Sequence, residues 1–274
     1  SMGLAVQGSD QTDSPVVEHL RKLGISVHVG HDAQDIQGAE FVIRTAAIHD
    51  DNPEIAAARA GGIPVFERAE AWGAIMRQYR NAVCIAGTHG KTTTTSMTTH
   101  IFMAAQADPT VMIGGTLPML HSGYRVGRGD TIILESCEYC NSFLHFFPTV
   151  AVVLNVEADH LDFFKDLDDI KQSFRRFAQL TPQDGHIVAN ADDAGAMDAL
   201  KGLPLFTFGC CEGADCQARN LTWQHGRPDF DVVAGGEVYT HLSLRVAGLH
   251  NVYNALAAAS AAYVLGIPGK AVRQ

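Results

Sequence analysis

The sequence has no long apolar run and few basic residues relative to its acidic ones. None of its segments reaches the roughly 18 apolar residues of a membrane span, and no signal peptide is visible in the 274 residues. Lysine and arginine total 20 against 30 aspartates and glutamates, a formal net charge of −10. We therefore expect no membrane insertion and no nucleic-acid-binding surface. A phosphate-rich ligand would have to be bound by local dipoles, lysine and Mg²⁺ rather than by the field of the whole protein.

Internal repeats and low-complexity segments are also missing. Apolar residues make up 46% of the chain, which is enough for a sizeable core. A chain of 274 residues can form one large domain or two ordinary ones.

The cysteines do not form a recognisable zinc motif. They are Cys84, Cys137, Cys140, Cys210, Cys211 and Cys216. Cys137 and Cys140 have the spacing of half a zinc site, but neither this pair nor the 210–216 cluster has a histidine partner at a fixed spacing. We expect six free thiols and a cytoplasmic protein.

Residues 1–80 alternate between helix and strand signals. Strands are predicted at 25–29, 40–44 and 63–66, and helices at 14–23, 52–60 and 67–79. This alternation predicts an α/β domain, a Rossmann-like parallel sheet with helices on its faces. Such sheets bind ligands beyond the carboxyl ends of their strands, where Gly8–Asp10 and Thr45–Ile48 are expected to lie.

Residues 81–274 predict a second α/β domain. Strands are expected at 82–86, 131–135, 150–155, 186–190 and 205–208, and helices at 91–103, 166–180 and 252–265. The segment 217–247 alternates polar and apolar residues and predicts antiparallel strands. A glycine-bearing stretch at 114–116 is followed by an expected loop to Gly129.

The segment 82–99 predicts a phosphate-binding cradle of the P-loop type. An apolar strand leads into a loop bracketed by Gly87 and Gly90, and a helix begins at Lys91. The loop N–H groups and the positive end of the helix dipole point to one spot, Lys91 adds a charge, and the Thr92 hydroxyl can ligate Mg²⁺. A plain glycine turn is the alternative, but the threonine run that follows is a poor helix former. The predicted nucleotide-binding residues are Gly87, Thr88, His89, Gly90, Lys91, Thr92 and Thr93.

Two acidic segments follow apolar strands. Glu135 ends one strand, where a carboxylate can reach a Mg²⁺ at Thr92; an ordinary solvated strand end is the alternative. The segment Asn155–Asp162 sets His160 among carboxylates, which suits a second metal. Lys91, Glu135 and His160 are the candidate catalytic residues, and Thr92, Glu135 and His160 are the candidate metal ligands. We expect Thr92, Glu135 and His160 to converge on one cleft.

Amide side chains open the last predicted helix. Asn251 and Asn254 lie on the same side of this helix as His250. Helix capping is one interpretation. The other is base binding, because an amide can present a donor and an acceptor to an adenine edge.

Together these segments resemble the Mur ligases, which build the stem peptide of peptidoglycan. The motifs that match, in the family's order, are Gly87–Thr93, Glu135-x-x-Glu138-x-x-x-Ser142-Phe143-Leu144, Asn155–Asp162 and Gly248–Asn254. Gly8–Asp10, Thr45–Ile48, Asp51–Pro53 and Gly62–Val65 extend the likeness into the first domain. The resemblance covers nearly the whole chain and is greatest to the ligases that join L-alanine to UDP-N-acetylmuramate.

The resemblance implies an ATP-dependent ligase of cell-wall biosynthesis. The carboxylate of UDP-N-acetylmuramate would attack the γ-phosphate of ATP, and the amine of L-alanine would displace phosphate from the acyl phosphate. Lys91 and two Mg²⁺ would neutralise charge, with Thr92 and Glu135 at the first metal and His160 at the second. Residues 1–80 would bind the UDP-sugar, and residues 81–274 would be the central ATP-binding domain.

The chain departs from the family pattern in three places. Many members read Glu-Ala-Asp-Glu-Ser-Asp where this chain has Glu135–Cys140. The family's N-terminal glycine-rich loop is missing or shortened at Ser1–Val6, and its C-terminal domain is absent after the last helix. Because that domain helps to hold ATP and the amino acid, we expect the 274 residues alone to bind nucleotide but not to ligate.

Other functions share some of these features. A recycling ligase that attaches a preformed tripeptide to the same UDP-sugar has overlapping motifs. Folylpolyglutamate synthetases use a similar loop, but here another domain precedes it. A nucleotide-binding fragment without catalysis would not need both Glu135 and His160.

Lys91 has no opposite charge within its own motif. We therefore expect Lys91→Ala to abolish phosphoryl transfer, measured as ADP release, while the fold stays intact.

Overall fold

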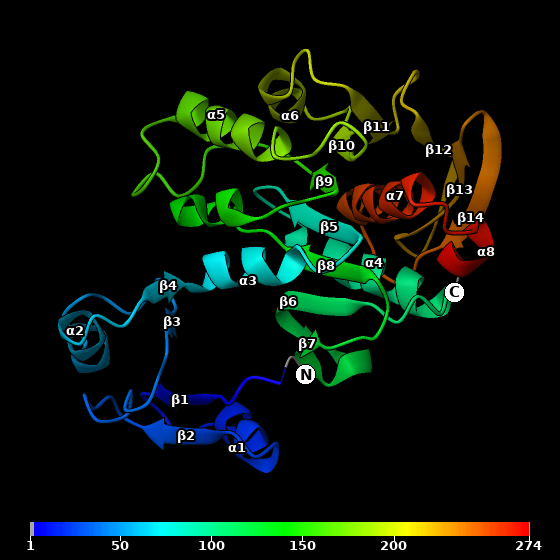
Figure 1. The fold of residues 1–274 in the computed structure, drawn as a ribbon. Coiled ribbons are helices and arrows are strands. Elements are labelled where there is room, and N and C mark those ends of the chain that lie inside the picture. The colour runs from blue at the N-terminus through cyan, green and yellow to red at the C-terminus, as the bar shows by residue number, and fades with distance from the viewer. Residues whose placement is uncertain (1–2, 274) are drawn as a thin grey trace. The chain divides into compact units, whose positions relative to one another are not determined.

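The computed structural model describes residues 3–273, so Ser1, Met2 and Gln274 lie outside the described residues, and with them the start of the Ser1–Val6 segment. The chain divides into two compact units, Ser1–Trp72 and Gly73–Gln274. Helix α3 (Arg68–Met76) spans the point of division (Figure 1). The expected boundary between residues 80 and 81 lies shortly after it, at the start of β5.

The first unit contains the predicted alternation of helices and strands. Its elements are β1 (Gln7–Asp10), α1 (Pro15–Lys22), β2 (Ser26–Val29), β3 (Val42–Arg44), α2 (Pro53–Ala60) and β4 (Val65–Glu67). β1 pairs with β2 and β3 pairs with β4, both in parallel. The parallel pairing is as expected, but the described residues form two separate two-stranded sheets instead of one, because none of them forms a strand that joins β1 to β3.

The helix starts of this unit follow the capping signals of the sequence. The Ser14 side chain accepts a hydrogen bond from the N–H of Val17, and Pro15 occupies the first turn of α1. The Asn52 side chain accepts from the N–H of Glu54 at the start of α2. Both caps satisfy N–H groups that have no partner inside the helix.

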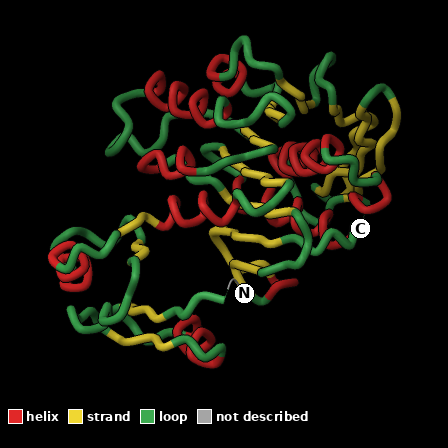
Figure 2. The backbone as a smooth tube through the Cα atoms, viewed as in Figure 1, coloured by secondary structure: helices red, strands yellow, loops and turns green. Residues whose placement is uncertain are grey.

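The second unit is built on one ten-stranded sheet (Figures 1 and 2). In spatial order its strands are β14 (Glu237–Ser243), β13 (Arg227–Ala234), β12 (Cys216–Gln224), β11 (Leu205–Gly209), β10 (His186–Asn190), β9 (Val150–Val153), β5 (Asn81–Ala86), β8 (Thr131–Glu135), β6 (Thr110–Leu117) and β7 (Ser122–Arg125). The strands from β12 to β6 are parallel, whereas β13, β14 and β7 run antiparallel to their neighbours. The predicted antiparallel segment is confirmed as the hairpins of β12, β13 and β14.

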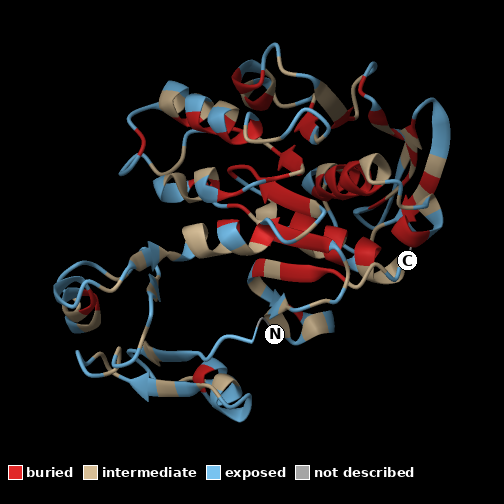
Figure 3. Ribbon diagram, viewed as in Figure 1, coloured by how far each residue is buried: buried red, intermediate tan, exposed pale blue. Residues whose placement is uncertain are grey.

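Helices cover both faces of this sheet. α4 (Lys91–Ala104), α7 (Leu249–Val264) and α8 (Gly269–Val272) pack on the face that carries Val83 and Ile85 of β5. The 3-10 helix η2 (Tyr139–His145), α5 (Leu167–Ala178) and α6 (Ala194–Ala199) cover the opposite face. There the rings of Phe143 and Phe177 stack with centroids 4.7 Å apart. The central strands are therefore buried on both sides (Figure 3), which explains their continuous apolar sequences.

Strands β6 and β7 occupy a region where the sequence predicted a glycine stretch and a loop; between them lies a short 3-10 helix, η1 (Pro118–Leu120). The reason is the position of Gly114 in β6. Its N–H donates to Oε2 of Glu135 at 2.7 Å, and a Cβ on Gly114 would lie 2.8 Å from Oε1 of the same carboxylate. The glycine therefore marks the close approach of a side chain to a strand rather than a turn.

All six cysteines are free thiols in the structure, as predicted. Cys84 in β5 is fully buried, and burial raises the pKa of its thiol to about 12. Within residues 3–273, no helix is long and apolar enough to cross a membrane.

A histidine between two aspartates makes the stability of the terminal hairpin depend on pH. His241 Nδ1 lies 2.8 Å from Asp231, its cross-strand partner, and Nε2 lies 3.3 Å from Asp229. The hydrogen bond to Asp231, aided by the charge of Asp229, raises the pKa of His241 above its ordinary value of 6.5. The protonated ring thus stabilises the fold below pH 6.5, and this contribution is lost as the pH rises through the folded-state pKa.

We therefore expect the melting temperature of the wild type to exceed that of His241→Gln by more at pH 5.5 than at pH 8.5. Thermal unfolding of both proteins across this range measures the difference. A gap that stays constant with pH would show that the ring does not titrate against the aspartates.

Candidate active site

The phosphate loop lies at the carboxyl end of β5, between the ends of two neighbouring strands. β5 pairs with β8 on one side and with β9 on the other. Glu135, at the end of β8, and the segment that follows β9 therefore flank the loop. This is the edge at which parallel sheets bind ligands.

The start of α4 is shaped to receive an anion. Gly90 is the N-cap residue, with a left-handed φ of 86°, and a Cβ there would lie 2.5 Å from Oδ1 of Asn254. Glycine is required by both the backbone conformation and the space. Since glycine has no side chain to accept from the first N–H groups of the helix, these groups remain available to a phosphate.

The segment after β9 holds the loop in place. Asn155 accepts from the N–H of His89 at 2.7 Å and donates to the His89 carbonyl at 3.1 Å. The N–H of Glu157 donates to the Thr88 hydroxyl at 2.9 Å. Because both partners lie on the neighbouring strand end, the loop is fixed by the sheet rather than by its own sequence.

Lys91 has a partner that the sequence did not reveal. Its ammonium Nζ donates to both carboxylate oxygens of Glu138, at 2.9 and 3.1 Å, and to the carbonyls of Gly87 at 2.6 Å and Thr88 at 3.2 Å. The motif itself holds no opposite charge, but the chain before η2 brings Glu138 to Lys91 from outside the motif. Lys91→Ala would leave this buried carboxylate unpaired, which argues for a loss of stability rather than an unaffected fold.

Thr92 and Glu135 meet as the metal hypothesis requires. The Thr92 hydroxyl donates to Oε1 of Glu135 at 3.0 Å, while the N–H of Gly114 holds Oε2. A hydroxyl and a carboxylate are ligands that Mg²⁺ prefers, and nucleotide-bound Mg²⁺ takes its other ligands from phosphates and water. The two side chains therefore fit a Mg²⁺ that arrives with a nucleotide.

His160 lies close to Glu138, the partner of Lys91. Its backbone has a left-handed φ of 51°, which is uncommon for a residue other than glycine. Nε2 lies 3.9 Å from Oε1 of Glu138 and 4.0 Å from Asp159, and the ring packs at 4.8 Å against that of Tyr139. His160 thus approaches Lys91 through Glu138.

The structure gathers the predicted catalytic residues around the first turn of α4. Thr92 contacts Glu135, and Lys91 contacts Glu138, which His160 approaches. Among residues 3–273, no three histidine, cysteine or acidic side chains are placed to hold a metal by themselves. Glu138 was not among the predicted site residues, although it lies only three positions after Glu135 in the quoted motif.

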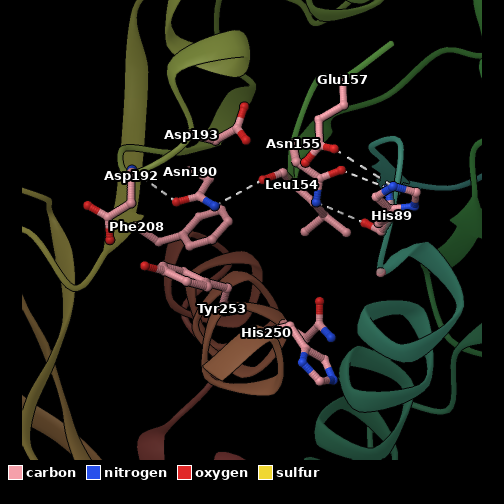
Figure 4. A pocket seen from close by; sticks show the side chains of 12 residues that line it. His89, Leu154, Asn155, Glu157, Asn190, Asp192, Asp193, Phe208, His250 and Tyr253 are labelled. Atoms are coloured by element: carbon pink, nitrogen blue, oxygen red, sulfur yellow. Dashed lines mark hydrogen bonds and ion pairs between the residues drawn. The ribbon is translucent and has the colours of Figure 1, made fainter. Parts of the chain in front are cut away.

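A cavity of about 330 Å³ adjoins the phosphate loop. Its lining residues are His89, Gly90, Leu154, Asn155, Glu157, Asn190, Asp192, Asp193, Phe208, His250, Tyr253 and Asn254. Figure 4 shows Phe208 and Tyr253 on the side opposite His89, with Asp192 above them. The aromatic faces and the carboxylate suit the base and the ribose of a nucleoside.

Asp192 is held as an anion in this wall. Burial alone would raise its pKa, but hydrogen bonds from the thiol of Cys211 and from the N–H of Cys210 outweigh it, so the pKa lies below its ordinary value. Asp192, Phe208 and Tyr253 were missed by sequence reasoning. The Asn190–Asp193 segment, which begins at the last residue of β10, carried a signal, because it resembles the polar segment that follows β9.

The two asparagines of α7 are mainly engaged within the protein. Asn254 accepts from the Thr94 hydroxyl of α4 at 3.1 Å and donates to Asn251 at 3.1 Å, and Asn251 donates to the Ala247 carbonyl at 2.7 Å. Both are buried, and of the two only Asn254 lines the cavity. The two asparagines join the start of α7 to the phosphate-loop helix. Base binding by Asn254 stays a prediction. Asn251 does not line the cavity, so it would act only by positioning Asn254.

Comparison with known proteins also points to the Mur ligases. The model of the Mur ligase family, catalytic domain, matches residues 1–80, and that of the Mur ligase middle domain matches residues 85–262. The UDP-N-acetylmuramate–L-alanine ligase of Caldanaerobacter subterraneus subsp. tengcongensis is 45% identical over 268 residues. This alignment covers 97% of the chain and 58% of the relative, so the chain spans little more than half the length of that protein.

Two solved structures resemble the chain closely. The UDP-N-acetylmuramate–alanine ligase of Thermotoga maritima aligns with a TM-score of 0.82 at 30% identity, over 97% of this chain and 61% of that one. A UDP-N-acetylmuramate:L-alanyl-γ-D-glutamyl-meso-diaminopimelate ligase from Neisseria aligns with a TM-score of 0.86 at 27% identity, over 98% and 89%.

The middle-domain model matches the region that carries the site. This region includes the phosphate loop, the paired Thr92 and Glu135 and the adjoining cavity, and it begins within β5. Since the two family models together account for most of the 274 residues, this chain belongs to the Mur ligase family.

Proposed function

We propose that this protein is an ATP-dependent ligase that joins L-alanine to UDP-N-acetylmuramate in peptidoglycan synthesis. The observation that carries the proposal is the assembly of Lys91, Thr92 and Glu135 at a phosphate loop beside a nucleoside-sized cavity. The 45% identity to a ligase of this name supports the choice of substrates. The free thiols are consistent with a cytoplasmic protein.

The reaction is proposed to run in two steps. A carboxylate oxygen of UDP-N-acetylmuramate attacks the γ-phosphorus of ATP, ADP leaves, and an acyl phosphate forms. The amine of L-alanine then attacks the acyl carbon, phosphate leaves with the C–O bonding electrons, and the amine gives up a proton. Since the charge on the transferred phosphoryl group is high, the protein's task is to position and neutralise it.

The residues of the site divide this task. The N–H groups at the start of α4 and the Lys91 ammonium bind the phosphates. Thr92 and Glu135 would hold a Mg²⁺, and His160 would be a ligand of a second; these ions would supply positive charge to the phosphoryl oxygens. Asp192 and Tyr253 line the side of the cavity proposed for the ribose and base.

The first unit is proposed to bind the UDP-sugar. At the end of β1, the Ser9 hydroxyl donates to Glu54 at 2.8 Å and lies 3.1 Å from Nδ1 of His31. Ser9 lies within β1 itself, so the expectation that Gly8–Asp10 lie beyond the strand is wrong, whereas His31 follows β2 and Glu54 lies in the first turn of α2. The three side chains meet near the carboxyl ends of β1 and β2, the edge at which parallel sheets bind ligands.

A second candidate is the recycling reaction in which a preformed tripeptide replaces L-alanine. The observation that favours it is the TM-score of 0.86 to the Neisseria ligase, slightly above the 0.82 of the Thermotoga alanine ligase. Sequence identity favours alanine, at 45% to the curated alanine ligase against 27% to the Neisseria protein.

A ligation assay distinguishes these functions. We would compare the 274-residue chain with the same chain extended by the parts of the Caldanaerobacter ligase that it does not cover. We expect ADP release by the extended protein to depend on both UDP-N-acetylmuramate and L-alanine, and the 274 residues alone to bind nucleotide without ligation. Turnover with the tripeptide but not with L-alanine would favour recycling, and no turnover with either would refute the ligase proposal.

Lys91→Ala is expected to abolish phosphoryl transfer and also to destabilise the second unit. Removing one member of a buried ion pair typically costs about 3–5 kcal/mol, and the Glu138 side chain is only 2% exposed. Chemical denaturation measures the loss of stability, and ADP release by the extended protein measures the loss of transfer. The matched double variant Lys91→Ala/Glu138→Gln should recover stability but not transfer; full transfer by either variant would contradict the assigned role of Lys91.

Glu135→Gln is expected to weaken the dependence of nucleotide binding on Mg²⁺. The neutral amide can still contact Thr92 but is a much poorer Mg²⁺ ligand than a carboxylate. Calorimetry with ADP in EDTA and in Mg²⁺ gives the ratio of the two affinities. A ratio equal to that of the wild type would remove Glu135 from the metal site.

A further inference from the structure

The ammonium of Lys91 is fully engaged by protein oxygens. It has three N–H donors, and four oxygens lie within hydrogen-bonding distance: two of Glu138 and the carbonyls of Gly87 and Thr88. A lysine in this arrangement cannot also donate to nucleotide phosphates. Phosphate binding by Lys91 therefore requires the loss of some of these contacts.

Glu138 is the strongest of these partners. Its side chain is 2% exposed and that of Lys91 is 13% exposed, so their attraction is little screened by water. The carboxylate belongs to Glu138, the residue before η2, and the ammonium to α4, 47 positions apart in the chain. The ion pair thus joins two elements across the phosphate loop.

We propose that Glu138 is a positioning residue that competes with the nucleotide for Lys91, so that nucleotide binding exchanges the Lys91–Glu138 ion pair for a Lys91–phosphate contact. The inference rests on the proposed nucleotide-binding function and deepens it. The affinity for nucleotide is lower than the loop alone would provide, because only molecules with a released Lys91 offer the full site.

The exchange would leave Glu138 buried with an uncompensated charge. Such a carboxylate strongly favours a replacement cation. His160 Nε2 lies 3.9 Å from Oε1 of Glu138, the same oxygen to which Lys91 donates at 3.1 Å. An imidazole nitrogen is therefore already close to the carboxylate oxygen that Lys91 would release. A divalent cation held there would make nucleotide and metal bind cooperatively, and without the metal the exchange would be costly.

The test uses the 274-residue chain, a non-hydrolysable ATP analogue and calorimetry. In EDTA, we expect Glu138→Gln to bind the analogue more tightly than the wild type by roughly fivefold or more, the size of a typical coupling between linked sites. In a Lys91→Met background the same substitution should leave the affinity unchanged, because no ammonium remains to be released. This double-mutant cycle separates the exchange from the general effect of removing a negative charge near phosphates.

A separate experiment tests whether a replacement cation binds at Glu138. With the analogue and Mn²⁺, electron paramagnetic resonance should count an additional bound ion in the wild type relative to Glu138→Gln. Thermal melts check that each variant is folded. If Glu138→Gln does not fold, Glu138→Asp keeps the charge but withdraws the carboxylate, and a smaller gain in affinity is expected.

Two results would overturn the inference. One is an unchanged or weaker affinity of Glu138→Gln in EDTA, and the other is the same gain in the Lys91→Met background. In either case the wild type still binds the analogue with Mg²⁺, so the proposed function survives. If the wild type does not bind the analogue with Mg²⁺, the proposed function falls, and this inference falls with it.

Discussion

The parallel pairing of β5 with β8 and β9 is the constraint on which the site depends. In this register Ile85 lies opposite Glu135, and Ala86 lies opposite Val153. The phosphate loop, the Glu135 carboxylate and the segment that carries His160 therefore leave the sheet at one edge. The buried apolar residues of β5 stabilise this arrangement, since each fully buried valine or isoleucine contributes about 1.5–3 kcal/mol. A sheet held in this way can position polar groups that would otherwise repel one another.

The site also requires glycine at two positions, because polar side chains approach the backbone there too closely for a Cβ atom. Gly90 admits the Asn254 amide next to the start of α4, and Gly114 admits the Glu135 carboxylate next to β6. Asn254 in turn accepts from Thr94, which ties α7 to α4 across the sheet face. The helix that binds phosphate and the helix that lines the nucleoside cavity thus form one rigid support.

The charged groups of the site form two contacts at the first turn of α4. Thr92 contacts Glu135, and Lys91 contacts Glu138, which His160 Nε2 approaches. The protein carries a formal net charge of −10, so a triphosphate meets local positive charge against an unfavourable overall field.

Much of this organisation could be predicted from the sequence because it is encoded locally. The strand, glycine loop and helix of the phosphate cradle, the caps at Ser14 and Asn52 and the antiparallel end of the sheet depend on neighbouring residues and on periodicity. The family resemblance likewise followed from short motifs in a fixed order. Glu135 and His160 were recognisable because each follows a buried strand or lies in a compact acidic segment.

Only the tertiary structure decided the contacts between segments that lie far apart in the chain. Neither the pairing of Lys91 with Glu138 nor the cavity wall of Asp192, Phe208 and Tyr253 has a local signature. No strand was predicted at the glycine stretch 114–116, whereas β6 passes through it with the Glu135 carboxylate held against Gly114. The sequence alone determined most of the helices and strands and the chemistry of the phosphate loop. The order of the strands, set by the burial of apolar faces over the whole domain, decided which side chains meet.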